Sequence, residues 1–147
     1  DYSYNYKVGT MTVKNVSVYY YANLRAGSVA DPETAMNMSE TYKASSISAV
    51  LKAAVGANIL SETYYTGEKG EEIADFSYSF KFGSDIKKTT SIYFYEPAML
   101  RATDAAVTTD SAMTRSDTYK VADLLGVVRD SPAGNNLASE MLGKPYG

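Results

Sequence analysis

The chain opens with a strict alternation of aromatic and polar residues. In residues 1–8, DYSYNYKV, every second position is Tyr or Val, and Ser, Asn and Lys stand between them. Neighbouring residues of a strand point to opposite faces, so this period of two predicts a strand with one buried face. Residues 75–82, DFSYSFKF, repeat the alternation with Phe at three of the same positions. We therefore predict a strand in both segments.

A second strand is predicted after each of these. Residues 12–22 and 89–96 are rich in β-branched and aromatic residues, which fit the pleated, half-buried surface of a sheet. Gly9 and Gly83 close the first strands at matching positions. Each pair of strands is therefore expected to form a hairpin.

These patterns belong to a duplication that covers nearly the whole chain. The aligned segments are 1–9 with 75–83, 17–21 with 91–95, and 35–60 with 112–137. The offset is 74 for the first two pairs and 77 for the third, so three inserted residues are enough to align the copies. We predict two tandem repeats, 1–74 and 75–147, that together form one compact domain. The SETYY segment at 61–65 falls outside the alignment and is interpreted as coincidence.

Each repeat is expected to continue with a helix, because apolar residues recur there at helical spacing. These residues are Ile47, Val50, Leu51 and Ala54 in the first repeat, and Val121, Leu124, Leu125 and Val128 in the second. Ser39 and Ser116 precede them, each followed by an acidic residue, Glu40 or Asp117. A serine cap followed by a carboxylate is typical of a helix start. A short final helix is predicted over residues 136–142.

The predicted fold class is α+β. A lone hairpin is marginally stable, so two ββα repeats are expected to combine into one antiparallel sheet. The repeats would be related by pseudo-twofold symmetry, with the helices packed on one face of the sheet. In effect, the chain would be a homodimer fused into one polypeptide.

Candidate binding residues lie on the sheet face away from the expected helices. If Val18 and Ile92 face the helices, alternation sends their tyrosine neighbours to the other face. The candidate interface residues are Tyr19, Tyr21, Tyr93, Tyr95, Lys7 and Lys81. Tyrosines among Ser and Lys form an apolar surface that also makes hydrogen bonds, which suits a protein interface or stacking against a sugar or a base. The alternatives are that both faces are buried, or that the tyrosines merely cover an exposed strand.

Composition removes several kinds of chemistry. The 147 residues include no Cys and no His, which excludes disulfides, thiolate metal ligands, Cys nucleophiles and a His general base. The net charge of -3 disfavours nucleic acid as a partner. No apolar run approaches the roughly 18 residues of a membrane span. We predict that the protein is not an enzyme, with no catalytic residue, metal site or cofactor.

Carboxylates are the remaining candidates for catalysis. They lie in the predicted loops and near the joint between the repeats: Asp31, Glu33, Asp104, Asp110, Glu62, Glu68, Glu71 and Glu72. A pair of them could act as acid and base on a glycoside. Carboxylates of loops and linkers are far more often solvated, so this hypothesis ranks last.

The sequence favours a non-catalytic structural protein that assembles with itself or with another protein. A subunit of a surface layer, a filament or a virus particle would fit, with an extracellular or virion location, because duplicated units present matching surfaces. The alternative is a small binding module whose tyrosine-rich sheet face takes carbohydrate or peptide. The chain starts at Asp1 rather than Met, so we expect a trimmed or processed product.

Overall fold

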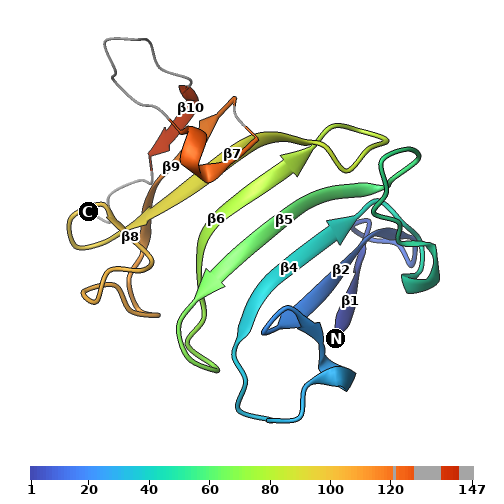
Figure 1. Cartoon of the computed structure of the whole chain (residues 1–147), viewed down its shortest axis with the longest axis horizontal. Coiled ribbons are helices and arrows are strands. Elements are labelled where there is room, and N and C mark those ends of the chain that lie inside the picture. Colours follow the sequence, from blue (N-terminus) through green and yellow to red (C-terminus); the bar gives the residue numbers. More distant parts are fainter. Residues whose placement is uncertain (121, 128–136, 143–147) are drawn as a thin grey trace.

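The computed structural model describes residues 1–120, 122–127 and 137–142, which form one curved antiparallel sheet (Figure 1). Its ten strands are β1 (Tyr2–Tyr6), β2 (Val13–Tyr21), β3 (Leu24–Arg25), β4 (Met36–Tyr42), β5 (Ile59–Thr66), β6 (Ile73–Phe80), β7 (Lys87–Tyr95), β8 (Leu100–Arg101), β9 (Met113–Tyr119) and β10 (Leu137–Leu142). Three single-turn 3₁₀ helices connect them: η1 (Ala26–Ser28), η2 (Ile47–Ala49) and η3 (Leu124–Gly126). Among the described residues, no helix is long and apolar enough to cross a membrane.

The four strands of the two predicted hairpins are confirmed, but the α+β class is wrong. The residues interpreted as capped helix starts lie inside β4 and β9. In β4, Ser39 and Thr41 point to one face of the sheet, and Glu40 and Tyr42 point to the other. Serine followed by an acid therefore belonged to a strand alternation, in which Thr and Tyr are favoured residues.

The helical spacing of the apolar residues comes from a single 3₁₀ turn rather than from a longer helix. Ile47 and Val50 both pack on the core, and residues three apart fall on the same side of a 3₁₀ turn such as η2. Leu51 and Ala54, which would have continued the helical face, are exposed.

In the second repeat, Leu124 lies in η3, Leu125 is exposed, and Val121 and Val128 lie outside the described residues. The final helix predicted over residues 136–142 is also wrong, because β10 occupies residues 137–142 and residue 136 is outside the described residues.

The predicted pseudo-twofold symmetry is corrected by the order of the strands. Across the sheet the order is β1-β2-β4-β5-β6-β7-β9-β10, with β3 beside β2 and β8 beside β7. The second four-strand set repeats the order of the first, whereas a twofold axis would reverse it. Since all neighbours are antiparallel, β1 and β6, four places apart, run in the same direction. The two copies are therefore joined head to tail through β5 and β6.

The copies make the same contacts at equivalent positions. The hydroxyl of Tyr4 accepts a hydrogen bond from the Ile47 N–H at 3.2 Å, and that of Tyr78 accepts one from the Leu124 N–H at 3.3 Å. The hydroxyls of Ser3 and Tyr19 pair at 2.8 Å, as those of Ser77 and Tyr93 do at 2.7 Å. Each contact thus ties together the same elements of its own copy.

The end of the sequence alignment needs one further inserted residue in the second copy. Glu62 of β5 lies opposite Glu40, and Glu140 of β10 lies opposite Asp117. This places residues 59–64 in register with 137–142, at an offset of 78 (140 for 62). The SETYY segment that the alignment excluded is part of β5, the strand that joins the copies.

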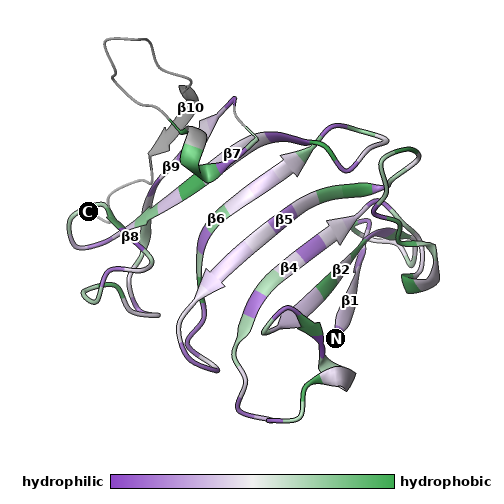
Figure 2. Ribbon diagram, in the orientation of Figure 1, coloured by the Kyte–Doolittle hydropathy of each residue, from purple (hydrophilic) through white to green (hydrophobic). Residues whose placement is uncertain are grey.

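The main core lies on one side of the sheet, which we call the core face. Its buried residues in the first copy and at the joint are Val16, Val18, Tyr42, Ala57, Ile59, Tyr78 and Phe80, and the turn at η2 packs over them. Polar positions nevertheless occur within β4 and β5 at the centre of the sheet (Figure 2). Two of these polar residues, Glu40 and Glu62, are charged and buried.

Candidate functional site

The side of the sheet opposite the core face carries continuous rows of hydroxyl groups, and we call it the hydroxyl face. The first row crosses six neighbouring strands and consists of Ser3, Ser17, Thr41, Ser61, Ser79 and Thr89. The second row crosses five strands and consists of Ser39, Thr63, Ser77, Ser91 and Thr118. Alternation along each strand could be read from the sequence, but only the strand register aligns these residues into rows.

Two of the predicted tyrosines belong to this hydroxyl face. Tyr19 pairs with Ser39 across β2 and β4, and Tyr93 pairs with Ser116 across β7 and β9. Both rings are half-buried. The phenol of Tyr19 is bonded to Ser3, as described above, so its hydroxyl already has a partner within the sheet.

The other two predicted tyrosines, Tyr21 and Tyr95, each come directly after a register shift in their strand. Their surroundings differ between the two copies. Tyr95 is buried with Ala102 and Val107, and its hydroxyl donates to the Ala74 carbonyl at 2.6 Å. This burial raises the pKa of Tyr95 to about 12. Tyr21 instead lines a cavity of about 230 Å³ together with Val29 and neighbouring loop residues. The four tyrosines thus do not form one uniform open platform.

The two predicted lysines lie in the hairpin turns. Lys7 follows β1 and Lys81 follows β6, and both are exposed. The Lys7 carbonyl accepts hydrogen bonds from Thr10, and the Lys81 carbonyl accepts the equivalent bonds from Ser84. Both lysines therefore take part in a repeated turn and stand outside the rows of hydroxyl groups.

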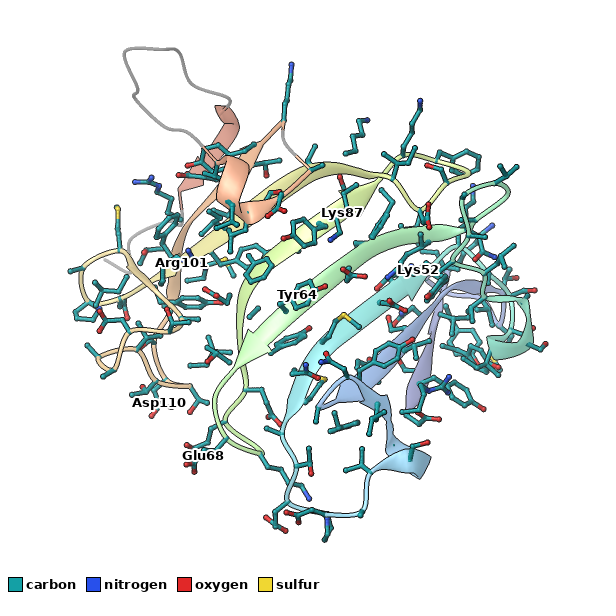
Figure 3. All side chains as sticks on the ribbon, in the orientation of Figure 1. Lys52, Tyr64, Glu68, Lys87, Arg101 and Asp110 are labelled. Carbon is teal, nitrogen blue, oxygen red and sulfur yellow. The ribbon has the colours of Figure 1, made fainter. Side chains whose placement is uncertain are left out.

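The core face holds a charged cluster that the sequence analysis did not anticipate. Nζ of Lys52 donates to Oε1 of Glu40 at 2.9 Å and to Oε2 of Glu62 at 2.5 Å (Figure 3). The hydroxyl of Tyr20 donates to Glu40 at 2.9 Å and that of Tyr64 donates to Glu62 at 2.5 Å. Both carboxylates are buried, with Glu62 only 2% exposed. Local sequence patterns could not reveal this cluster, because the two glutamates lie opposite each other only through the register of their strands.

The protonation states of this cluster follow from its hydrogen bonds. Burial by itself would raise the pKa of Glu40, but hydrogen bonds from Tyr42, Lys52 and Tyr20 outweigh burial and hold that pKa below its ordinary value. Burial and the hydrogen bond to Glu40 raise the pKa of Tyr20 to about 12. A general acid would need a carboxyl pKa shifted upward, which is the opposite of the shift at Glu40.

In the second copy, Asp117 stands at the position equivalent to Glu40 and forms an ion pair with Arg115. Nε and Nη2 of Arg115 donate to the two carboxylate oxygens of Asp117 at 2.9 and 2.6 Å. Tyr119 donates to the same carboxylate at 3.2 Å, as Tyr42 does to Glu40. A buried acid beneath a tyrosine hydroxyl is therefore common to both copies.

A cleft lies between the β5–β6 turn and the loop after β8. Its volume is about 650 Å³, and its lining includes Glu68, Glu71 and Asp110. Figure 3 shows Glu68 and Asp110 in these two loops. All three acids are exposed. Among the described residues, no group of three or more acidic side chains is placed to hold a metal ion.

The edge of the sheet at β1 differs from the joint between the copies. At the joint the ring of Tyr64 stacks on Phe76 with centroids 4.7 Å apart, and Phe80 is 7% exposed. On β1, Tyr2 and Tyr6 stand at the positions equivalent to these phenylalanines and are 44% and 47% exposed. An aromatic surface that is covered inside the chain is therefore uncovered at its edge.

Comparisons of the chain with protein families, with curated proteins and with solved structures found no match.

Proposed function

We propose that the protein is a non-catalytic structural subunit that assembles with copies of itself. The observation that carries this proposal is the head-to-tail joint between its two copies, made by β5 and β6. Units joined in this way have different surfaces at their two ends, and the surface at one end is complementary to that at the other. Such heterologous contacts build rings when they close and filaments when they do not.

Additional support comes from the charged groups on the core face. Lys52, Glu40 and Glu62 satisfy one another through hydrogen bonds, and no buried side-chain polar atom among the described residues lacks a partner. Groups that are fully paired in this way stabilise one arrangement of the sheet. This is the behaviour expected of a structural unit.

The proposal is tested by the mass of the protein in solution. Light scattering should give a mass that rises with concentration, and electron microscopy of concentrated samples should show rings or filaments. A mass that stays at that of one chain up to millimolar concentration would overturn the proposal.

A second candidate is a binding module that takes carbohydrate or peptide on the hydroxyl face. Tyr19 and Tyr93 favour it, because these half-buried rings lie at equivalent positions beside rows of hydroxyl groups. Aromatic rings flanked by hydrogen-bonding groups suit sugar rings. Binding to a glycan or peptide array should then weaken in Tyr19→Ala and Tyr93→Ala variants, and unchanged binding in both would remove this candidate.

A further inference from the structure

We propose that β1 of one molecule pairs antiparallel with β10 of a second copy of the chain. This contact would repeat between chains the joint that β5 and β6 form within the chain. The inference rests on the proposed self-assembly and adds to it the surfaces, the partner and the register.

The internal joint supplies the template. Glu62 of β5 lies opposite Tyr78 of β6, and Tyr64 lies opposite Phe76. The Gly56 N–H donates to the Gly83 carbonyl at 2.8 Å and extends the contact beyond the strands. The sheet is thus continuous where one copy ends and the next begins.

β1 has the same construction as β6. Tyr2 and Tyr4 meet edge to face with ring centroids 5.5 Å apart and an interplanar angle of 61°, and Phe76 and Tyr78 do so at the same distance and an angle of 71°. Both strands shift register at the same point, after Asn5 in β1 and after Ser79 in β6. Within the described residues, β1 lacks the second neighbouring strand that β6 has in β5.

The backbone of β1 is oriented to receive that strand. The Tyr19 N–H donates to the Asp1 carbonyl at 2.9 Å, so Asp1, Ser3 and Asn5 bond toward β2. In an antiparallel pair these roles alternate, which turns the N–H and C=O groups of Tyr2 and Tyr4 to the open edge. β1 carries no charge and no proline, the usual features that protect a sheet edge from pairing.

β10 is the counterpart of β5 at the other end of the sheet. It pairs with β9 in the register that β5 keeps with β4, and no second strand lies beside it within the described part of the chain. Transfer of the internal register gives the expected pairs between molecules. They are Tyr2 with Leu142, Ser3 with Met141, Tyr4 with Glu140, and Asn5 with Ser139.

The first test places a charge on the edge. Tyr2→Lys should weaken self-association about tenfold or more, because the lysine would lie within the pairing strands. Ile86→Lys is the matched control, since Ile86 is 58% exposed and lies in the turn between β6 and β7, away from both edges. The mass of each variant by analytical ultracentrifugation is the readout, and circular dichroism verifies that each is folded.

The second test reports the register directly. The chain has no cysteine, so a Ser3→Cys, Met141→Cys variant can form only engineered disulfides. Ser3 would be a non-hydrogen-bonded position at this contact, where Cα atoms are about 4.5 Å apart, a distance compatible with a disulfide. Mild oxidation should yield covalently linked chains. The control, Tyr2→Cys with Met141→Cys, places the two thiols on opposite faces and should link far less.

Hydrogen exchange provides a readout without any substitution. The amides of Tyr2 and Tyr4 should exchange more slowly as the protein concentration rises, because pairing between molecules would protect them. This measurement decides the proposal even if an engineered variant fails to fold.

The outcomes separate this inference from the proposed function. Assembly that both lysine variants leave equally intact, without cross-linking or protection of β1, would overturn the β1–β10 contact and leave self-assembly standing. A strict monomer would overturn both. A mass that falls only in Tyr2→Lys, with cross-links only in the Ser3 pair, would support both.

Discussion

Arg101 donates two parallel hydrogen bonds to the carboxylate of Asp75, and Arg25 donates two to the carboxylate of Asp1 in the other copy. Nε and Nη2 of Arg101 donate to the two carboxylate oxygens at 2.8 and 2.9 Å, and the corresponding distances for Arg25 are 2.6 and 2.7 Å. Each pair ties the start of the first strand of its copy to the short strand that follows the second. The two pairs differ in burial, because Asp75 is 6% exposed and Asp1 is exposed.

This difference predicts unequal contributions to stability. Asp75→Asn should lower the free energy of unfolding by about 2 kcal/mol, because it leaves the Arg101 charge without its partner in a partly buried site. Asp1→Asn should lower it by less than about 1 kcal/mol, as is usual for exposed pairs. Urea unfolding of both variants provides the measurement, and equal losses would contradict the role assigned to burial.

Lys52→Met should be among the most destabilising single changes in the first copy. It leaves Glu40 and Glu62 buried without a cation, a situation that typically costs about 3 kcal/mol or more. The exposed Lys14 of β2 offers a matched control, since Lys14→Met removes the same charge from a solvated position. A similar stability for the two variants in urea would show that the cluster is not held together by Lys52.

The same cluster predicts how stability depends on pH. The pKa of Glu40 is lower in the folded protein than its ordinary value of 4.5. The stability that ionised Glu40 contributes to the fold is therefore complete above that ordinary value, and it is lost as the pH falls through the lower folded value. In Lys52→Met the pKa of Glu40 should rise, so acid unfolding should begin at higher pH than in the unmodified protein. Unfolding curves between pH 2 and 7 would reveal the shift, and identical acid transitions would argue against it.

A proline substitution in β4 would distinguish a strand from a helix start at SETYK. Thr41→Pro should cost about 3 kcal/mol or more, because proline cannot donate to the ladder of a central strand. In a helix that begins after Ser39, proline in the first turn would be well tolerated. Thr41→Val keeps the β-branched shape and should remain folded. Circular dichroism and thermal melting of the two variants make the comparison, and a folded Thr41→Pro protein would contradict the strand.

Alanine substitutions at two glycines would distinguish the cost of backbone strain from that of steric overlap. Gly9 and Gly67 both have positive φ, +73° and +114°. A methyl group at Gly9 would meet nothing within 4 Å, whereas one at Gly67 would collide with the Glu71 carbonyl. Gly9→Ala should therefore cost about 1 kcal/mol for its conformation alone, and Gly67→Ala clearly more. The difference in urea midpoint checks this, and a reversed order would refute it.

Part of the candidate site could be predicted from the sequence. Alternation along β2 and β7 correctly separated Tyr19 from Val18 and Tyr93 from Ile92. It could not place Tyr95 under a loop, nor bring Glu40, Glu62 and Lys52 together. Those contacts depend on which strands become neighbours and on a one-residue register shift near each strand end, and neither is written in local periodicity.

The sequence alone determined the duplication and the two hairpins, since identity at a fixed offset and a period of two are properties of the chain itself. Only the tertiary structure decided that residues 39–42 and 116–119 belong to strands, because Ser followed by an acid suits a helix cap as well as a strand. The choice depends on the partners of the acid, which are Lys52 and tyrosine hydroxyls for Glu40. Strand pairing also decided that the copies follow one another head to tail, because β5, which contains the SETYY segment excluded from the sequence alignment, supplies the hydrogen bonds that join them.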